Sequence, residues 1–155
     1  MSGVTIKFEG KKELDKRLQK MIGRFTDLRP LHKLWSVSTH RWVMRNFQSE
    51  GQLTGEPWQR LSARTLDLRR GNTSRILQDT GRLRASFQPR HDGEKAEVGT
   101  AVEYAPQHQF GKTAAMGLRV RLPKRPMLPE KYSLISRDIE AITLRYIRGS
   151  RQKPI

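Results

Sequence analysis

The sequence predicts an α+β fold in which a small antiparallel sheet, made of a hairpin and an N-terminal strand, packs with two long helices, a C-terminal helix and an extended arm. Three observations support this prediction. Hydrophobic residues recur at helical spacing in two long N-terminal stretches and again near the C-terminus. An alternating stretch precedes the first helix, and an Asp-Gly pair separates two strand-like runs. Strands and helices are mixed along the chain and do not alternate, which favours α+β over a doubly wound sheet.

The length of the chain predicts a single domain. A protein of 155 residues can bury roughly two thirds of its unfolded surface in one core. We therefore expect one domain over residues 1–148, including a docking arm over residues 112–126, followed by a basic flexible tail over residues 149–155. Hydrophobic residues make up 35% of the chain, which is low for a globular domain, so the core is expected to be modest.

The N-terminal region is predicted to form one strand and one helix. Val4, Ile6 and Phe8 alternate with polar residues, as in a half-buried strand, and Gly10 bounds this run. From residue 11 onward the apolar residues follow a helical period, at Leu14, Leu18, Met21, Ile22 and Phe25. This helix is expected to end near residues 23–25.

A second long helix is predicted to begin near Pro30, because proline is favoured in a first turn, and to end near residues 50–51. Its apolar stripe consists of Leu31, Leu34, Trp35, Ser38 and Trp42, extended by Val43 and Phe47. Aromatic residues carry much of the area that a core buries, so the stripe is expected to face the core. Two glycines and a proline mark residues 51–62 as a loop, in which Trp58 either plugs the edge of the core or contacts a partner.

Short elements are expected in the middle of the chain, where capping residues and turn signals follow one another closely. They are a helix over residues 63–70 capped by Ser62, a helix through Ser86 capped by Asp79 or Thr80 and anchored by Leu83, and strands over residues 87–91 and 96–102. The two strands flank Asp92-Gly93, which is a strong signal for a β-hairpin.

The last part of the chain combines a helical turn, an arm and a helix. Residues 104–111 (YAPQHQFG) fit a single helical turn closed by Gly111. Residues 112–126 show no periodicity and are expected to order when docked on a neighbour. Ser133 is expected to cap the last helix, whose apolar side carries Leu134, Ile135, Ile139, Ile142, Tyr146 and Ile147.

The chain carries a formal net charge of +16, from 31 basic and 15 acidic residues. Residues 60–90 contain arginines and no lysine, whereas residues 91–111 carry more acidic than basic side chains. Arginine makes planar, bidentate contacts with carboxylates and phosphates, so residues 60–90 fit a contact surface as well as they fit a solvated one. The charge predicts an acidic partner, namely nucleic acid, an anionic membrane or an acidic protein surface.

Motifs for catalysis and metal binding are absent from the sequence. There is no cysteine, no HExxH pair, no GxGxxG or P-loop pattern and no GxSxG elbow. His108 could act as a general base, but Glu103 is the single carboxylate near it in sequence, and a structural histidine is the preferred interpretation. We expect no enzyme activity, no metal and no cofactor. No apolar run approaches the ~20 residues that span a bilayer, and the N-terminus lacks a secretory signal, so a cytoplasmic protein is expected.

Four segments resemble motifs of one protein family, in the family's order. GQLTGEPWQRLS (residues 51–62) resembles a DGxPWxPLS loop, and ILQDTGRLRASF (residues 76–87) resembles an L.DTGxLrxSi segment. VGTAVEYAPQHQFG (residues 98–111) is similar to vGtnvpYAaiHqfG, and PKRPMLP (residues 123–129) is similar to iPaRPfLg. The family that they resemble is that of the phage virion morphogenesis, or tail completion, proteins.

The resemblance implies a structural role in the neck of a tailed bacteriophage. Such a subunit is expected to form a ring, with six copies as the expected number, that joins head and tail around the DNA channel. The implied partners are the portal or a head-completion adaptor on one side and a tail terminator or tail tube protein on the other, with non-specific contact to packaged DNA and no membrane. The protein would be assembled in the host cytoplasm. The chain departs from the family pattern at Arg60, where the motif has proline, and in the basic stretch over residues 112–125.

A ring subunit needs two different, complementary patches. We expect Arg82 and Arg84 to meet acidic residues such as Glu94, Glu97 or Glu103 of the next subunit, and salt bridges within one hairpin are an equally open alternative. The expected subunit-interface residues are Trp58, Arg82, Arg84, Glu97, Glu103, Tyr104, His108 and Phe110. The residues expected in the docking arm or at the DNA channel are Lys112, Arg119, Arg121, Lys124 and Arg125.

Two other functions stay open from the sequence. One is a non-specific nucleic-acid-binding module that acts through phosphate contacts, and the other is a tail terminator that caps the tail tube. Tight DNA binding with a steep salt dependence would favour the nucleic-acid-binding module. Weak DNA binding, together with ring formation in the presence of a connector, would favour the neck role.

Overall fold

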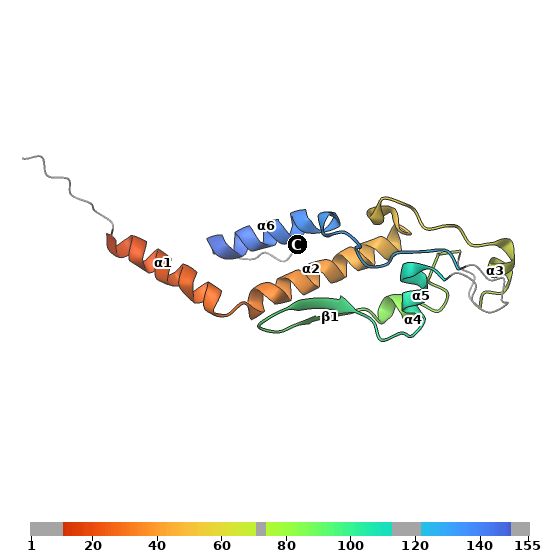
Figure 1. The fold of residues 1–155 in the computed structure, drawn as a ribbon, viewed down its shortest axis with the longest axis horizontal. Helices are drawn as coiled ribbons and strands as arrows, with labels where there is room; N and C mark the ends of the chain where they lie inside the picture. The colour runs from red at the N-terminus through yellow and green to blue at the C-terminus, as the bar shows by residue number, and fades with distance from the viewer. Residues whose placement is uncertain (1–10, 71–73, 113–121, 150–155) are drawn as a thin grey trace, which may run out of the picture.

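The computed structural model describes residues 11–70, 74–112 and 122–149, and it shows an elongated molecule built around one long helix (Figure 1). The elements in chain order are α1 (Lys11–Thr26), α2 (Arg29–Gln48), η1 (Gln52–Thr54), α3 (Ala63–Asp67), α4 (Arg82–Ala85), β1 (Gln88–His91), β2 (Ala96–Gly99), α5 (Ala105–Phe110), η2 (Tyr132–Leu134) and α6 (Ser136–Arg148). The helix α6 lies along one side of α2 and the β1–β2 hairpin along the other, while α1 extends beyond one end of α2. This arrangement confirms the predicted α+β class.

The helix α2 is the centre of the core because its apolar stripe faces elements on several sides. Trp42, Val43 and Phe47 are buried as predicted. Phe47 packs edge-to-face against Trp58 and Phe87, with ring centroids 5.4 and 5.7 Å apart. Such aromatic pairs contribute about 0.5–1.5 kcal/mol beyond the area that they bury. The loop that carries Trp58 and the strand that follows Phe87 are thereby anchored to the same side chain of α2.

The N-terminal half of α2 is covered less completely. Leu34, Trp35 and Ser38 belong to the predicted stripe but are only half-buried. Here α6 lies against α2, and Nε1 of Trp35 donates a hydrogen bond to Oγ1 of Thr143, at 3.1 Å. The described part of α6 contains no fully buried residue, so this side of the molecule keeps apolar surface partly open to solvent.

The hairpin forms as predicted, with strands shorter than expected. Gln88 pairs with Gly99 in antiparallel register. The turn is fixed by Asp92, whose Oδ1 accepts hydrogen bonds from the backbone N–H groups of Glu94 and Lys95, at 2.8 and 2.9 Å. These two bonds favour the charged carboxylate and hold the pKa of Asp92 below its ordinary value. The predicted strand before the first helix lies outside the described residues.

Residues 125–128 form a strap that crosses the core, and the first two residues of this strap are the last two of the predicted docking arm (residues 112–126). Nδ2 of Asn46 donates to the carbonyl oxygens of Pro126 and of the next residue, at 3.0 and 3.3 Å. Nε1 of Trp58 donates to the same Pro126 carbonyl at 3.0 Å. A segment without sequence periodicity is thus held by side chains from α2 and from the preceding loop.

The helix α5 binds the strap from its other side. Oε1 of Gln109 accepts hydrogen bonds from the backbone N–H groups of Met127 and Leu128, at 2.8 and 3.0 Å. Met127, which directly follows the predicted arm, is 1% exposed, and Arg125 within the arm is 6% exposed, so this part of the chain belongs to the core. Residues 113–121 of the predicted arm lie outside the described residues.

Helix starts agree with the predicted caps at α3 and differ at two other helices. Ser62 caps α3, because its Oγ accepts a backbone N–H of the first turn at 3.2 Å. At α4 the cap position is Gly81, with φ of +72°, a conformation that glycine adopts readily. The Thr80 hydroxyl accepts the first helical N–H at 3.4 Å, and Asp79 takes no part. Ser133 lies in the short turn η2 before α6 and does not cap that helix.

We expect Gln109→Ala to lower the free energy of unfolding by about 2–4 kcal/mol, because it leaves two buried backbone N–H groups without an acceptor. Urea denaturation followed by circular dichroism would measure the change. The matched control is Gln107→Ala, since Gln107 lies on the same helix with an exposed side chain. Equal midpoints for the two variants would show that the strap does not depend on Gln109.

Candidate subunit-interaction site

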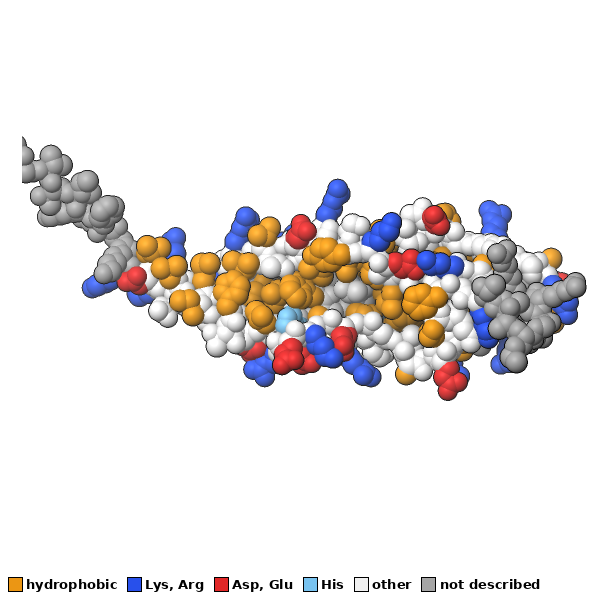
Figure 2. All heavy atoms as spheres, viewed as in Figure 1, with side chains coloured by type: hydrophobic (Ala, Val, Ile, Leu, Met, Phe, Trp, Pro, Cys, Tyr) orange, Lys and Arg blue, Asp and Glu red, His pale blue; other side chains and the backbone are white. Residues whose placement is uncertain are grey.

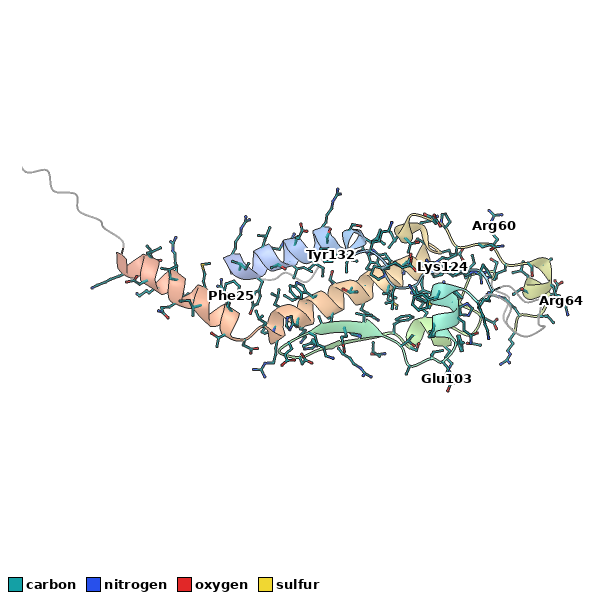
Figure 3. The ribbon with its side chains drawn as sticks, in the orientation of Figure 1. Phe25, Arg60, Arg64, Glu103, Lys124 and Tyr132 are labelled. Carbon is teal, nitrogen blue, oxygen red and sulfur yellow. The ribbon has the colours of Figure 1, made fainter. Side chains whose placement is uncertain are left out.

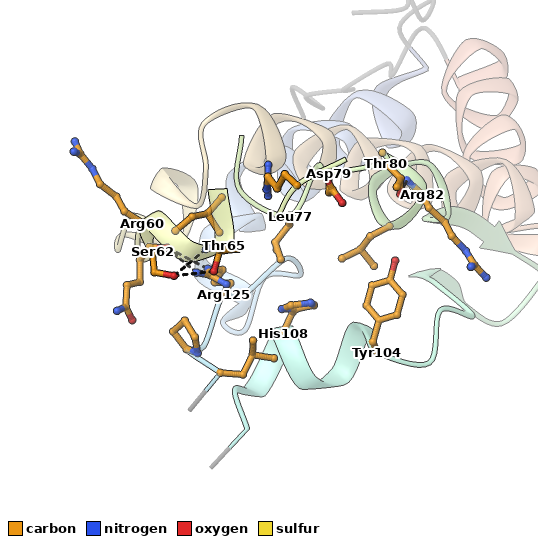
Figure 4. Close-up of a pocket in the computed structure, with 17 residues that line it drawn as sticks. Arg60, Ser62, Thr65, Leu77, Asp79, Thr80, Arg82, Tyr104, His108 and Arg125 are labelled. Atoms are coloured by element: carbon orange, nitrogen blue, oxygen red, sulfur yellow. Dashed lines mark hydrogen bonds between the residues drawn. The ribbon is translucent and has the colours of Figure 1, made fainter. Parts of the chain in front are cut away.

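A pocket of about 500 Å³ lies between α3, the segment before α4, α5 and the residues that lead into the strap (Figure 4). Its lining combines basic side chains with hydroxyl groups and leucines. The polar and charged lining includes Arg60, Arg69, Arg82, Arg125, His108, Ser62, Thr65, Asp79, Thr80 and Tyr104. In the close-up, His108 of α5 and Tyr104 at its N-cap lie on one side, and Thr80 and Arg82 lie on the opposite side. The pocket therefore brings together segments that are far apart in the sequence.

One wall of the pocket has an unfavourable backbone conformation. Leu77 adopts φ of +58°, which costs a residue other than glycine about 1–3 kcal/mol. Hydrogen bonds on both sides hold it in place. Oε1 of Glu50 accepts the backbone N–H of Ile76 at 2.8 Å, and Nε2 of Gln78 donates to the Phe47 carbonyl at 2.9 Å. The wall is thus fixed to the end of α2 before any partner arrives.

Arg125 lines the pocket and is 6% exposed. Its Nε and Nη2 donate to the carbonyl oxygen of Gln59, at 3.2 and 3.0 Å. Burial lowers the pKa of the guanidinium, and the nearby charge of Arg69 lowers it further. Among the described residues, no Asp or Glu forms a salt bridge with Arg125. A buried cation is therefore held by a neutral carbonyl beside a second cation.

His108 is half-buried on α5, and its Nδ1 has no hydrogen-bond partner within the described part of the chain. The His108 carbonyl accepts the backbone N–H of Arg125 at 2.7 Å. Its ring lies edge-to-face against Tyr104, with centroids 5.9 Å apart. Burial, and then the charge of Arg125, lower the pKa of His108 below its ordinary value. The imidazole is accordingly neutral at pH 7.

Four residues that the sequence singled out meet at this pocket. They are Arg82, Tyr104, His108 and Arg125. The sequence assigned the first three to a subunit interface and the fourth to the docking arm or the DNA channel. In the structure Arg125 is buried within the domain. Arg60 and Arg69 were not singled out, although both belong to the arginine-rich stretch that indicated a contact surface.

The other predicted interface residues lie elsewhere. Trp58 is 4% exposed, because it completes the aromatic cluster around Phe47, and it has little surface left for a neighbour. Arg84 is half-buried and donates to Oε1 of Gln78 at 3.3 Å. Phe110 is 72% exposed at the end of α5.

The two acidic residues predicted at the subunit interface, Glu97 and Glu103, differ in whether they form a salt bridge. Glu97 accepts a salt bridge from Lys95 on the hairpin, at 2.8 Å, which is the local pairing that the sequence left open. Glu103 is exposed just before α5, away from Arg60 and Arg64 (Figure 3). Within the described ranges Glu103 forms no salt bridge.

The remaining arm residues divide into two pairs. Lys112 pairs through its backbone with Leu122, and Lys124 forms a salt bridge with Glu130 at 2.8 Å. Lys124 is labelled in the right half of the molecule in Figure 3. Arg119 and Arg121 lie outside the described residues.

The helix α1 presents an exposed apolar face and extends beyond one end of α2. The exposed fractions are 57% for Leu14, 46% for Leu18, 38% for Met21, 57% for Ile22 and 52% for Phe25. The main contact of α1 is with α6, where Oη of Tyr146 donates to the Arg24 carbonyl at 3.2 Å and Nη1 of Arg24 donates to the Ile147 carbonyl at 2.7 Å. Figure 2 shows apolar side chains continuing from α1 along the side where α6 covers α2.

The described residues offer neither a metal site nor a membrane span. No group of three or more His, Asp or Glu side chains among them is arranged to hold a metal ion. No helix in the same ranges combines the length and the apolar character that a bilayer crossing requires.

The chain resembles known proteins over most of its length. Residues 10–147 match the phage virion morphogenesis family. The chain is also similar to the Mu-like prophage FluMu G protein 2 of Haemophilus influenzae, with 29% identity over 140 residues that cover 88% of this chain and 94% of that protein. No solved structure matches the chain significantly.

The lowered pKa of His108 predicts a pH dependence of stability. As the pH falls through about 6.5, the unfolded chain takes up a proton at this residue more readily than the folded chain does. The stabilisation is therefore fully present above that pH and is lost as the solution is acidified towards the lower pKa of the folded state. We expect His108→Gln to flatten this part of the stability curve, measured by urea denaturation between about pH 8 and pH 5. An unchanged slope would contradict the assignment.

Proposed function

The chain belongs to the phage virion morphogenesis family, and from that premise we propose that it completes the tail and joins it to the head in the neck of the virion. It does so as a ring of six copies around the DNA channel. One face of the ring contacts the portal or a head-completion adaptor, and the other contacts a tail terminator or the tail tube. The mechanism is interface formation, with no chemical step.

The exposed apolar face of α1 carries this proposal. Most of the stability of a helix in a protein comes from packing its amphipathic face, and the main contact of the 16-residue helix α1 lies near one end, at Arg24. Leu14, Leu18, Met21 and Phe25 follow the alternating spacing of four and three residues that is typical of helix–helix seams. Monomeric proteins rarely leave such a face uncovered, so we infer that a neighbouring subunit covers it in the assembled particle.

The positive charge supports contact with DNA or with acidic subunits. Each copy contributes a formal charge of +16, so copies in a ring repel one another unless anions neutralise them. We assign this contact to Lys112 and Lys124 of the predicted arm, together with Arg119 and Arg121. Arg125 is withdrawn from this set, because a residue that is 6% exposed cannot track a DNA backbone.

We propose that Arg82 of one subunit faces acidic residues of the next. Arg82 is exposed at the pocket, whereas Arg84 is half-buried and already bonded to Gln78. Glu97 is neutralised by Lys95 within its own hairpin. Glu94 and Glu103 are exposed, and they are the acidic residues that we assign to this contact.

The alternative is a non-specific nucleic-acid-binding module, which the net charge of +16 favours. A titration of duplex DNA at increasing salt separates the two functions. Binding through many phosphate contacts weakens steeply with salt, by about 10³–10⁵-fold between 50 and 200 mM for 6–10 contacts. Tight binding of this kind without ring formation would favour the alternative.

A phage genome that lacks this gene provides the decisive test of the neck role. We expect electron micrographs of the lysate to show unjoined heads and tails, and wild-type protein supplied in trans to restore infectious particles. The variant Leu18→Glu with Ile22→Glu should fold normally, because both side chains are exposed, but should fail to restore particles. The control is Lys16→Gln with Lys20→Gln, which changes the net charge equally on the opposite face of the helix.

Normal particle yield with the Leu18→Glu and Ile22→Glu variant would contradict the proposed role of α1. Complete virions in the absence of the gene product would contradict the neck role itself.

Charge reversal tests the contact between subunits. We expect Arg82→Glu to reduce ring formation and particle yield, because an exposed attractive pair of about 0.2–1 kcal/mol becomes repulsive at every interface. The additional change Glu103→Arg should restore part of the loss. Arg64→Glu, an equal change of charge at an exposed position of α3, is the control and should have little effect. Equal losses of particle yield for Arg82→Glu and Arg64→Glu would show that the change in net charge is the cause. Such a result would reject the specific pairing of Arg82 with acidic residues of the next subunit.

A further inference from the structure

The pocket contains a buried guanidinium without a counter-ion. Arg125 is 6% exposed, and Nε and Nη2 both donate to one carbonyl oxygen, that of Gln59. A guanidinium carries five N–H donors, and within the described part of the chain no hydrogen bond or salt bridge involves Nη1 of Arg125. Buried charges are costly unless an opposite charge and further hydrogen bonds compensate them.

The surroundings of Arg125 add further positive charge. Arg69 is close enough to lower the pKa of Arg125, and Arg125 in turn lowers that of His108. Asp79 is the one carboxylate in the described lining, and it forms no salt bridge with Arg125. Residues 113–121 contain no Asp or Glu, so that part of the chain has no carboxylate to offer. Within the described residues, therefore, no carboxylate neutralises Arg125.

The shape and lining of the pocket fit a carboxylate on a peptide. A volume of about 500 Å³ accommodates several side chains and is typical of specific ligand sites. Leu77 and Leu83 can contact the aliphatic part of an entering side chain, and Nδ1 of His108 is an unpartnered polar atom in the described chain. The planar fork of arginine matches a carboxylate in a bidentate geometry.

We propose that this pocket binds an acidic peptide segment of another virion subunit, in which one Asp or Glu side chain contacts Arg125 and a second acidic side chain contacts Arg82 at the opposite end of the lining. The inference rests on the proposed role as an assembly subunit and names the chemistry of the partner. On binding, the first of these carboxylates supplies the counter-charge that Arg125 lacks among the described residues.

A DNA backbone fits this pocket less well than a peptide does. The phosphates of a duplex lie on the outside of a convex rod, whereas the guanidinium of Arg125 lies below the surface. A glutamate side chain can extend into a cavity from a peptide at the rim. The apolar part of the lining also favours a peptide, since it has nothing to contact on a phosphodiester.

Fluorescence anisotropy with a labelled hexaglutamate peptide tests the proposal at low salt. We expect Arg82→Gln to weaken binding about tenfold, as for the loss of one charge-assisted hydrogen-bonded contact. The matched control, Arg64→Gln, removes the same charge from an exposed position of α3 outside the pocket and should change binding less than twofold. The Arg125→Lys variant keeps the positive charge but loses the planar guanidinium, so it should bind the peptide more weakly than the wild type. Its melting temperature is measured alongside to show that the variant is folded.

NMR of the histidine side chains gives a second readout on the same samples. Saturating peptide should shift the His108 imidazole signals, and an unlabelled 20-base-pair duplex should compete poorly. Equal weakening by Arg82→Gln and Arg64→Gln, or no shift at His108, would overturn the pocket as the binding site. Displacement of the peptide by the duplex at equal charge concentration would assign the site to nucleic acid and overturn the proposal. If the peptide fails to bind while phage lacking the gene still accumulates unjoined heads and tails, the pocket assignment is rejected and the neck function stands.

Discussion

The fold depends on how the backbone of the strap is held inside the domain. Asn46 of α2, Trp58 of the loop and Gln109 of α5 each bond to the strap through a polar side-chain atom in a largely buried setting. Buried backbone groups without partners are costly, so these three contacts make it possible for an extended segment to pass through the core. The strap in turn places Arg125 at the pocket and leads the chain to α6.

This arrangement gives a physical reason for the Arg-Pro sequence before Met127. The proline has no N–H group to satisfy, and its carbonyl receives both Asn46 and Trp58. Arg125 reaches back to the Gln59 carbonyl and so joins the strap to the loop that follows Trp58. Two of the segments that resemble family motifs, residues 51–62 and 123–129, are therefore in direct contact. This contact has an electrostatic cost, because it buries the charged guanidinium of Arg125.

Local patterns in the sequence were sufficient to predict the regular elements but not to predict the strap. Helical periodicity located α1, α2 and α6, and Asp92-Gly93 located the hairpin, because these signals arise within one element. The strap shows no periodicity since its partners are Asn46 and Gln109, which are distant in sequence, and hydrogen bonds of this kind leave no local signature. The pocket was predictable in part, because Arg82, Tyr104 and His108 were singled out, but the burial of Arg125 follows from tertiary contacts alone.

The amphipathic pattern of α1 is a second case in which the sequence alone does not determine the contacts of an element. Periodicity shows that one face of the helix needs an apolar partner, but it does not specify whether the partner lies in the same chain. In the structure the α1 face is open, and no described carboxylate forms a salt bridge with Arg125 in the pocket. Two surfaces of different physical type are therefore available to partners. Apolar burial is non-directional and gives affinity in proportion to area, whereas charge complementarity selects the partner and its orientation. A subunit that carries both can be held strongly by one neighbour and positioned by another.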